Sequence, residues 1–180
     1  MIHPWRDMPT GPHPPERVTA VIEIPRGSRN KYELDKETGM FKLDRVLYSA
    51  VHYPGDYGFI PRTLHEDNDP MDILVRINEP TFPGCQIECR PIGVLRMLDK
   101  GEPDDKVLAV PMYDPFHHEV FDIADMPQHY LKEVEHFFHI YKDLEGKRVQ
   151  ILGWEKSEVA LRLIEESIQR YAETYLRVGP

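Results

Sequence analysis

Three aspartates within six residues, Asp67, Asp69 and Asp72, form the segment with the clearest capacity for chemistry. Asp67 and Asp69 stand two positions apart, so in an extended segment both side chains point to the same side. Pro70 restricts its own backbone and that of Asp69, which favours a turn that brings Asp72 toward that side. Crowded carboxylates repel one another unless a cation lies between them. Hard oxygen ligands on a short turn suit Mg²⁺, which binds a few carboxylates together with waters and phosphates.

Two other interpretations of this acidic segment compete with a magnesium site. The first interpretation is a solvated acidic loop, which is the more common structure for an isolated segment of this kind. The second is a calcium-binding EF-hand loop, but positions five, six and twelve counted from Asp67 are Met71, Asp72 and Asn78. An EF-hand places an oxygen ligand, a glycine and a glutamate there, so this second interpretation fits poorly.

Further charged and phenolic residues recur at the ends of apolar segments. The carboxylates are Glu23, Glu33, Asp99, Asp104 and Asp105, the cations are Lys31, Arg45, Lys106 and Lys142, and the phenols are Tyr53, Tyr57 and Tyr141. If these side chains converge, the acids can hold several metal ions while the cations bind anionic oxygens beyond them. Such a mixed cavity is typical of a polyphosphate site. Taken alone, each residue has the character of an ordinary surface charge, so the hypothesis depends on convergence.

The elements that must position these residues are mostly short strands. Apolar runs bounded by turn residues predict strands at 18–24, 31–34, 40–43, 73–77, 87–97, 106–110 and 148–153. Residues 35–39 predict a hairpin turn, and residues 53–58 predict a polar, aromatic loop. Helical periodicity predicts one helix that ends near His139, with Tyr130, Leu131, Val134, Phe137 and Phe138 on one face. It also predicts a closing helix capped by Ser157. The expected inward residues of the closing helix are Ala160, Leu163, Ile164, Ile168, Tyr171 and Tyr175. Antiparallel strands followed by helix, strand and helix predict an α+β domain built on a small barrel or curled sheet.

Length and composition limit the class of protein. The 180 residues predict a proline-rich N-terminal arm at 1–17, draped over a single catalytic domain at 18–180. A net charge of −9 argues against binding to nucleic acid or an anionic membrane. No apolar run approaches the roughly 20 residues of a membrane span, and no secretory signal is recognisable. Cys85 and Cys89 would lie about 13 Å apart on a strand, too far for a disulfide. We therefore expect a reduced, cytoplasmic protein.

The sequence resembles the soluble family I inorganic pyrophosphatases, from about Val18 to the closing helix. Residues 67–72 match that family's D-[SGDN]-D-[PE]-x-D signature. Further family-like segments follow in the same order, at 23–25, 31–33, 44–45, 53–58, 90–94, 104–106, 136–138 and 141–145. The resemblance implies an OB-like five-stranded β-barrel with flanking helices. It also implies Mg²⁺-dependent hydrolysis of pyrophosphate to two phosphates by a metal-activated hydroxide, with several ions per active site.

The resemblance assigns a role to each matching residue. Metal ions would be held by Asp67, Asp72, Asp104, Asp99 and Glu23. Asp69 would be the general base or would orient the attacking hydroxide. Phosphate oxygens would be bound by Lys31, Arg45, Tyr57, Lys106, Tyr141 and Lys142, with Glu33 and Tyr53 in support. Lys100 departs from the pattern, because relatives usually place an acid directly after the residue that matches Asp99.

The histidines are weaker candidates. His136 and His139 lie one helical turn apart, but no nearby cysteine or carboxylate completes a zinc site. The resemblance instead places His136 at a contact between subunits of a homo-oligomer, commonly a hexamer in bacterial relatives. His117 and His118 are expected in a solvated loop.

Two other functions remain as alternatives. One is an OB-like binding module in which the acids place only a structural metal, although basic and aromatic residues are not interleaved as in single-strand binders. The other is a phosphatase that acts on nucleotides or long polyphosphate.

Overall fold

The computed structural model describes residues 2–176. The strands are β1 (Val18–Ile24), β2 (Asn30–Leu34), β3 (Phe41–Val46), β4 (Asp56–Phe59), β5 (Asp72–Val75), β6 (Gln86–Asp99), β7 (Glu102–Pro103), β8 (Lys106–Pro111) and β9 (Val149–Lys156). The helices are α1 (Gln128–Ile140) and α2 (Ser157–Tyr171). Shorter helical turns are η1 (Pro115–His117), η2 (Ile123–Asp125), η3 (Asp143–Glu145) and η4 (Ala172–Leu176).

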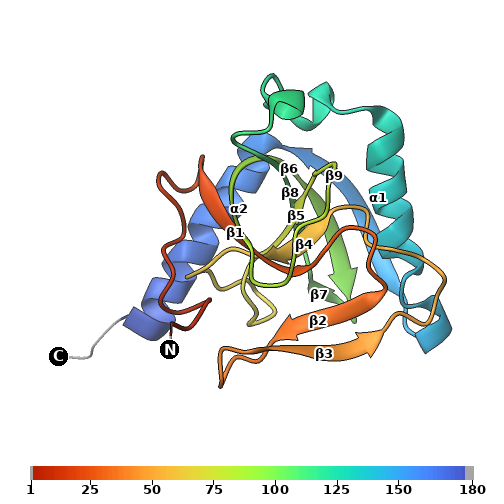
Figure 1. The fold of residues 1–180 in the computed structure, drawn as a ribbon, viewed down its shortest axis with the longest axis horizontal. Coiled ribbons are helices and arrows are strands. Elements are labelled where there is room, and N and C mark those ends of the chain that lie inside the picture. The colour runs from red at the N-terminus through yellow and green to blue at the C-terminus, as the bar shows by residue number, and fades with distance from the viewer. Residues whose placement is uncertain (1, 177–180) are drawn as a thin grey trace.

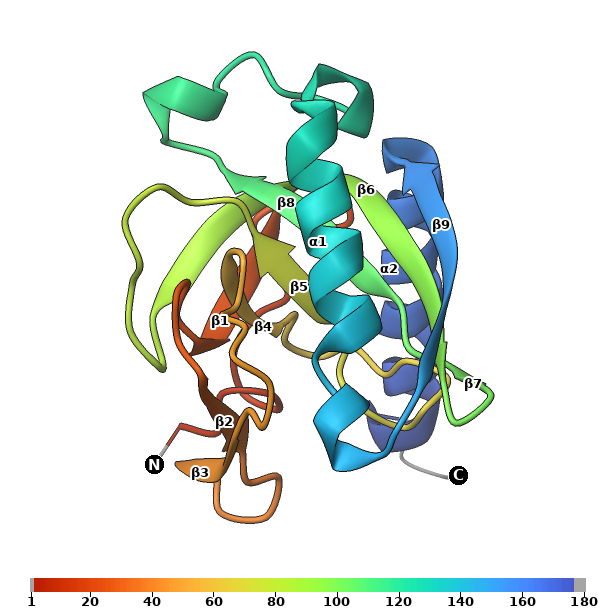
Figure 2. The same cartoon turned by 90° about the vertical axis from the view of Figure 1, so that its right-hand side faces the viewer.

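Five strands close into a ring, as Figure 1 shows. Neighbouring strands pair in the order β1, β4, β5, β8, β6, and β6 pairs again with β1. The strands β7 and β9 extend β6, while β2 and β3 form a separate hairpin beside β1 (Figure 2). The predicted α+β class and five-stranded arrangement are therefore confirmed. One detail differs, because β5 and β8 run parallel rather than antiparallel.

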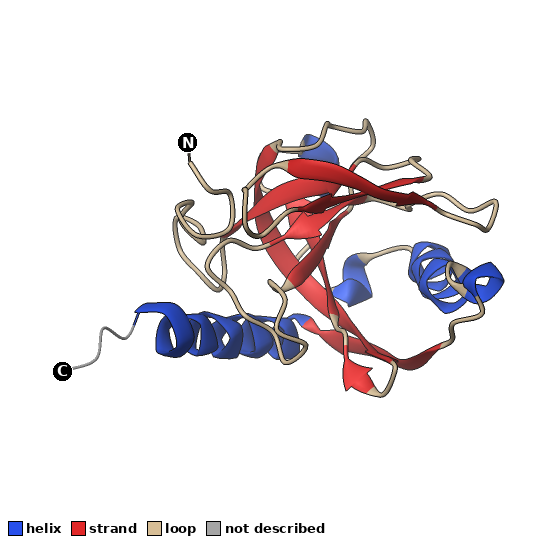
Figure 3. Cartoon of the chain, turned by 90° about the horizontal axis from the view of Figure 1, so that it is seen from below, coloured by secondary structure: helices blue, strands red, loops and turns tan. Residues whose placement is uncertain are grey.

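The strands alternate their side chains between two apolar clusters, as the pleat of a strand requires. Leu74 and Leu108 pack with the buried face of α1, whereas Ile73 and Val107 pack with α2. The buried residues of α1 are the predicted ones, Tyr130, Leu131, Val134, Phe137 and Phe138. The two helices lie on different sides of the strand ring (Figure 3). No helix within residues 2–176 has the length and apolar composition needed to cross a membrane.

The loop predicted at 53–58 is wrong in its second half, because β4 begins at Asp56. This strand belongs to the ring and pairs with β1 on one side and with β5 on the other. Asp56 is fully buried, and its carboxylate accepts hydrogen bonds from the backbone of Arg26 and from Thr81. At Gly58 a Cβ atom would lie 1.9 Å from the Val21 carbonyl oxygen, so glycine allows β1 to approach. Both residue types usually mark loops, and here long-range contacts override that preference.

Three further local expectations are also wrong. The cap of α2 is Lys156, and Ser157 is the first helical residue, whose hydroxyl lies 2.8 Å from a carboxylate oxygen of Asp122. Tyr175 lies in η4 and is 49% exposed rather than inward. His117 is buried and bonds the Asp114 carboxylate at 2.8 Å, because η1 folds this segment back on itself.

The segment of residues 2–17 forms no helix or strand, apart from an isolated bridge between His13 and Arg17. It nevertheless contributes to the core, because Trp5 is only 2% exposed. The indole packs edge-on against Tyr171 at 5.8 Å between ring centroids. This segment therefore lies against the body of the protein.

Candidate active site

A cavity of about 640 Å³ opens between the strand ring, the β2–β3 hairpin and the end of α1. Its wall is unusually rich in charge. The carboxylates are Glu23, Glu33, Asp67, Asp69, Asp72, Asp99, Glu102 and Asp104. The cations are Lys31, Lys36, Arg45, Lys100, Lys106, Lys142 and Lys147. The convergence on which the polyphosphate hypothesis depends is thus present.

The floor of the cavity is set by strand register. Asp72 on β5 stands opposite Lys106 on the parallel strand β8, and Asp104 precedes that strand by two residues. The Lys106 ammonium lies 2.5 Å from an Asp72 oxygen and also pairs with Asp104. Burial disfavours the ammonium, but the two carboxylates outweigh it and raise the pKa of Lys106. Lys106 therefore stays charged between the two acids.

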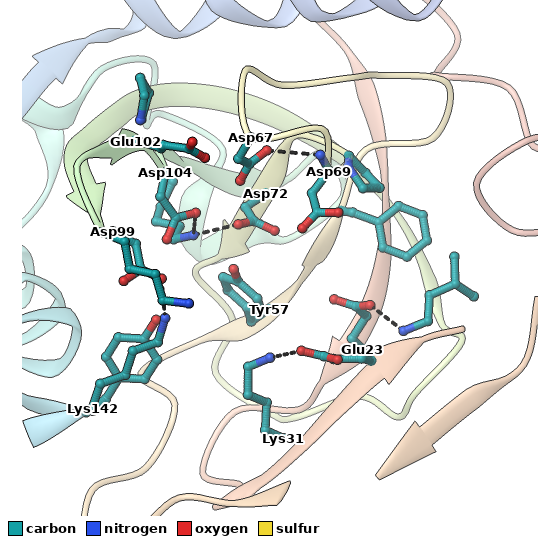
Figure 4. A pocket seen from close by; sticks show the side chains of 18 of the residues that line it. Glu23, Lys31, Tyr57, Asp67, Asp69, Asp72, Asp99, Glu102, Asp104 and Lys142 are labelled. Carbon is teal, nitrogen blue, oxygen red and sulfur yellow. Dashed lines mark hydrogen bonds and ion pairs between the residues drawn. The ribbon is translucent and has the colours of Figure 1, made fainter. Parts of the chain in front are cut away.

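The acidic loop reverses direction at Asn68 rather than running extended from Asp67 to Asp69. Asn68 has φ +66°, a left-handed conformation that asparagine tolerates better than most residues. The Asp67 carboxylate accepts the Asp69 backbone N–H at 3.0 Å, and the His65 N–H donates to the Asp69 carbonyl at 2.7 Å. These bonds leave Asp67 beside Asp72 and Asp104, as seen in Figure 4. Burial raises the pKa of Asp67.

The two ends of the cavity differ in composition. At one end Lys142, just after α1, lies 2.6 Å from Asp99 at the end of β6. At the other end Glu23 of β1 accepts the Leu34 N–H at 2.7 Å, close to Lys31 (Figure 4). Burial raises the pKa of Glu23 to about 8. The Glu23 carboxyl is thus protonated at neutral pH unless a cation binds it.

Phenols and one guanidinium complete the wall. Burial raises the pKa of Tyr57 and of Tyr141, so both hydroxyls remain neutral donors at physiological pH. The Arg45 guanidinium lies 2.8 Å from Glu145, which fixes its direction. Asp105 is buried away from the cavity, where its carboxylate accepts a hydrogen bond from the Arg96 guanidinium at 2.9 Å. Tyr53 does not line the cavity either. It packs 5.3 Å from the Tyr57 ring and supports it from behind.

The donor set fits divalent metal ions with hard oxygen ligands. The Asp99 Oδ1 atom is buried and has no hydrogen-bond partner, so it is available as a ligand. Within residues 2–176 no three acidic, histidine or cysteine side chains converge closely enough to form a complete site. The pairs of carboxylates in the wall suit a divalent ion that takes one or two carboxylates and completes its shell with water and phosphate. Asp67, Asp72, Asp99, Asp104 and Glu23 are the residues that would hold such ions.

Sequence reasoning missed several wall residues. Lys36, Glu102 and Lys147 line the cavity although no motif singled them out. Lys36 follows Asp35 in the hairpin turn and pairs with Asp69 across 33 residues of sequence. A long-range ion pair of this kind leaves no local signal.

The sequence model of the inorganic pyrophosphatase family matches residues 20–172 of this chain. The chain belongs to this family. The inorganic pyrophosphatase of Geobacillus stearothermophilus is 58% identical over 156 residues, which cover 87% of this chain and 94% of that protein. The inorganic pyrophosphatase of Haloferax volcanii is 50% identical over 97% of this chain and 99% of its own length.

Solved structures agree with membership of the inorganic pyrophosphatase family. The inorganic pyrophosphatase of Thermus thermophilus superposes with a TM-score of 0.88 and is 47% identical. The match covers 91% of this chain and 96% of that one. The family implies a divalent metal cofactor, in agreement with the donor set of the cavity.

Proposed function

We propose that this chain hydrolyses inorganic pyrophosphate to two phosphates in the presence of Mg²⁺. The observation that carries the proposal is one cavity in which Asp67, Asp72 and Asp104 face one another while cations surround them. Acids alone would repel a polyanion, and cations alone would not hold metal. A wall that combines both kinds of group suits a metal–polyphosphate complex.

The residues divide into three groups by what they would hold. Asp67, Asp72 and Asp104 hold metal at the floor, with Asp99 and Glu23 at the two ends. Bound divalent ions lower the pKa of water and offset the negative charge of phosphoryl oxygens. Phosphoryl oxygens are bound by Lys31, Arg45, Tyr57, Lys106, Tyr141 and Lys142. Glu33 pairs with Lys31 and, together with Tyr53, keeps those groups in place.

Asp69 is the proposed general base. It is 52% exposed and pairs with Lys36 rather than with the buried Lys106, so its carboxylate remains reachable from the cavity. In the reaction a water oxygen forms a bond to one phosphorus, and the bond from that phosphorus to the bridging oxygen breaks. Asp69 accepts the water proton, while Lys31, Arg45 and Lys142 offset the charge that the leaving phosphate develops.

The wider setting is part of the same proposal. We place the protein in the cytoplasm, where its free cysteines stay reduced. We also propose a homohexamer, with the exposed residues His136 and His139 of α1 near a subunit contact.

A phosphate-release assay tests the function. Pyrophosphate, ATP and tripolyphosphate are supplied separately with Mg²⁺, and phosphate is measured over time. The proposal expects pyrophosphate to be hydrolysed far faster than the other two. Preference for ATP or tripolyphosphate would instead favour a broader phosphatase, and no release from any of them would favour a binding module.

A further inference from the structure

The first part of the N-terminal arm, residues 3–7, packs directly behind the cavity. Trp5 is 2% exposed and belongs to one apolar cluster with Leu34 and Phe59. Leu34 and Phe59 also line the cavity, so the indole supports the wall from its rear side. The family model matches from residue 20 onward, whereas the alignment with the Haloferax volcanii relative covers 97% of the chain and so extends into this arm.

Hydrogen bonds connect the arm to the acidic loop. The Trp5 indole N–H donates to the Thr63 carbonyl at 2.9 Å, and the Arg62 backbone N–H donates to the Trp5 carbonyl at 2.9 Å. Thr63 is fully buried, and its hydroxyl oxygen accepts the Met71 N–H at 2.9 Å. Met71 precedes Asp72, so the arm holds the start of the loop that carries Asp69, and the Thr63 side chain links that start to the end of the loop.

The same arm also contacts the turn between β2 and β3. The His3 Nε2 atom lies 3.0 Å from the Lys36 carbonyl oxygen. Gly39 has φ +72° and packs so closely that a Cβ there would lie 3.2 Å from the His3 ring. The Lys36 ammonium lies 5.9 Å from the Trp5 ring centroid and forms an ion pair with Asp69. The arm therefore bridges two neighbouring segments that line the cavity, the hairpin turn and the acidic loop.

An exposed ion pair of two mobile side chains contributes little by itself, because ordering both side chains costs entropy. The pair can fix a geometry only where another contact already holds the backbone of one partner. Here His3 holds the backbone of Lys36, and the bond between Trp5 and Thr63 holds the loop of Asp69.

We propose that the N-terminal arm is a positioning element of the active site, which holds Lys36 against Asp69 and so orients that carboxylate. Lys36 is then a positioning residue that acts through Asp69. The inference rests on the proposed function, since it takes Asp69 as the group that accepts the proton.

The kinetic test uses the full chain with Mg²⁺ and pyrophosphate. Lys36→Ala should lower kcat about tenfold and leave KM within about twofold, because misplacing a reacting group costs rate rather than affinity. Lys36→Arg should restore most of the loss. Lys42→Ala is the matched control, because it removes an exposed pair with Asp35 from the same hairpin and should leave kcat unchanged. A rise in KM at constant kcat would overturn the inference by making Lys36 a substrate contact.

The role of the arm is tested with His3→Ala, which loses the contact to Lys36 without emptying the core. This variant should lower kcat about fivefold. The double variant with Lys36→Ala should lose no more than Lys36→Ala alone, because both changes remove one coupled arrangement. If the fold-losses in kcat of the two single variants multiplied in the double variant, the coupling of Lys36 to the arm would be contradicted. Trp5→Phe, which keeps the packing and loses the bond to Thr63, gives a second variant of the arm.

Hydrogen exchange of the metal-free protein gives a readout that does not need activity. His3→Ala and Trp5→Phe should raise exchange in both 36–40 and 65–71, whereas Lys42→Ala should not. Unchanged exchange in these segments would overturn the inference even if pyrophosphate is hydrolysed. Raised exchange in a protein that does not hydrolyse pyrophosphate would support the bridge and reject the proposed function.

Discussion

Asp69 and Asp72 stand three residues apart in one acidic segment, yet their surroundings differ. Asp69 is more than half exposed and pairs with a surface lysine, whereas Asp72 lies against the buried Lys106. Burial raises the pKa of Asp72, so its charge depends on a cation nearby. The two residues therefore suit different tasks, proton transfer at Asp69 and cation binding at Asp72.

Exchange of each aspartate for asparagine separates these tasks. Asp69→Asn should lower kcat by at least about 10²-fold and leave the metal titration nearly unchanged, because the base is lost but the metal ligands stay. Asp72→Asn should shift the metal titration strongly to higher concentration. Calorimetric metal titrations and steady-state rates measure both effects. Identical metal titration curves for the two variants would rule out this division of roles.

Lys100 lies at the rim of the cavity, exposed and with φ +53°, directly after Asp99. Its positive charge lowers the negative potential around a proposed metal ligand. Lys100→Glu should lower the Mg²⁺ concentration for half-maximal activity a few-fold, about 1 kcal/mol at low ionic strength. Lys132→Glu on α1 makes the same charge change outside the cavity and should have no such effect. An unchanged or raised midpoint for Lys100→Glu in low salt would contradict this expectation.

At the scale of elements, Asp122 joins η2 to the start of α2. Its carboxylate accepts hydrogen bonds from the Ala124 backbone and from both the N–H and the hydroxyl of Ser157. Burial alone would raise the pKa of the Asp122 carboxyl. The hydrogen bonds from Ser157 and Ala124 outweigh burial, so the pKa lies below its ordinary value. The stabilisation is therefore present above the unfolded pKa near 4 and is lost as pH falls through the lower folded pKa.

Asp122→Ala tests this junction. It should lower the free energy of unfolding by about 1–2 kcal/mol at pH 7, or Tm by several °C. The difference in stability from the parent protein should shrink as pH falls below about 4, because the unfolded state then binds a proton that the folded Asp122 carboxylate takes up only at lower pH. Glu119→Ala, on the neighbouring exposed loop, is the control. Thermal melts at pH 7 and pH 3 measure the difference in Tm between Asp122→Ala and the parent protein. A difference of equal size at both pH values would contradict the stabilising role of the Asp122 carboxylate.

The elements also show what the sequence reveals and what it conceals. The acidic segment and the apolar face of α1 were predictable because their signals lie within one turn or one helix. β4 was not, because Asp56 and Gly58 take their roles from Arg26, Thr81 and Val21, which are distant in sequence. The pairing of Lys36 with Asp69 was concealed for the same reason. The roles of the cavity residues stay predictions until variants are measured.

At the scale of the whole molecule, the net charge of −9 coexists with a cavity in which acids and cations alternate. The exposed face of α1 carries His136 and His139 beside a second hollow lined by Asp143 and Arg148. Light scattering at pH 8 should give a mass near six times the 21.1 kDa of one chain. Exchange of both histidines for glutamate should lower that mass, and a monomeric parent protein at micromolar concentration would refute the hexamer.

The most direct test of a metal-dependent pyrophosphatase site is phosphate release from pyrophosphate before and after removal of divalent ions. The purified protein should release phosphate with Mg²⁺, stop when excess EDTA is added, and recover when Mg²⁺ is restored. Asp67→Asn should need more Mg²⁺ for recovery, because a carboxylate that holds metal has lost its charge. Phosphate release that continues in excess EDTA would contradict the role assigned to the carboxylates of the cavity.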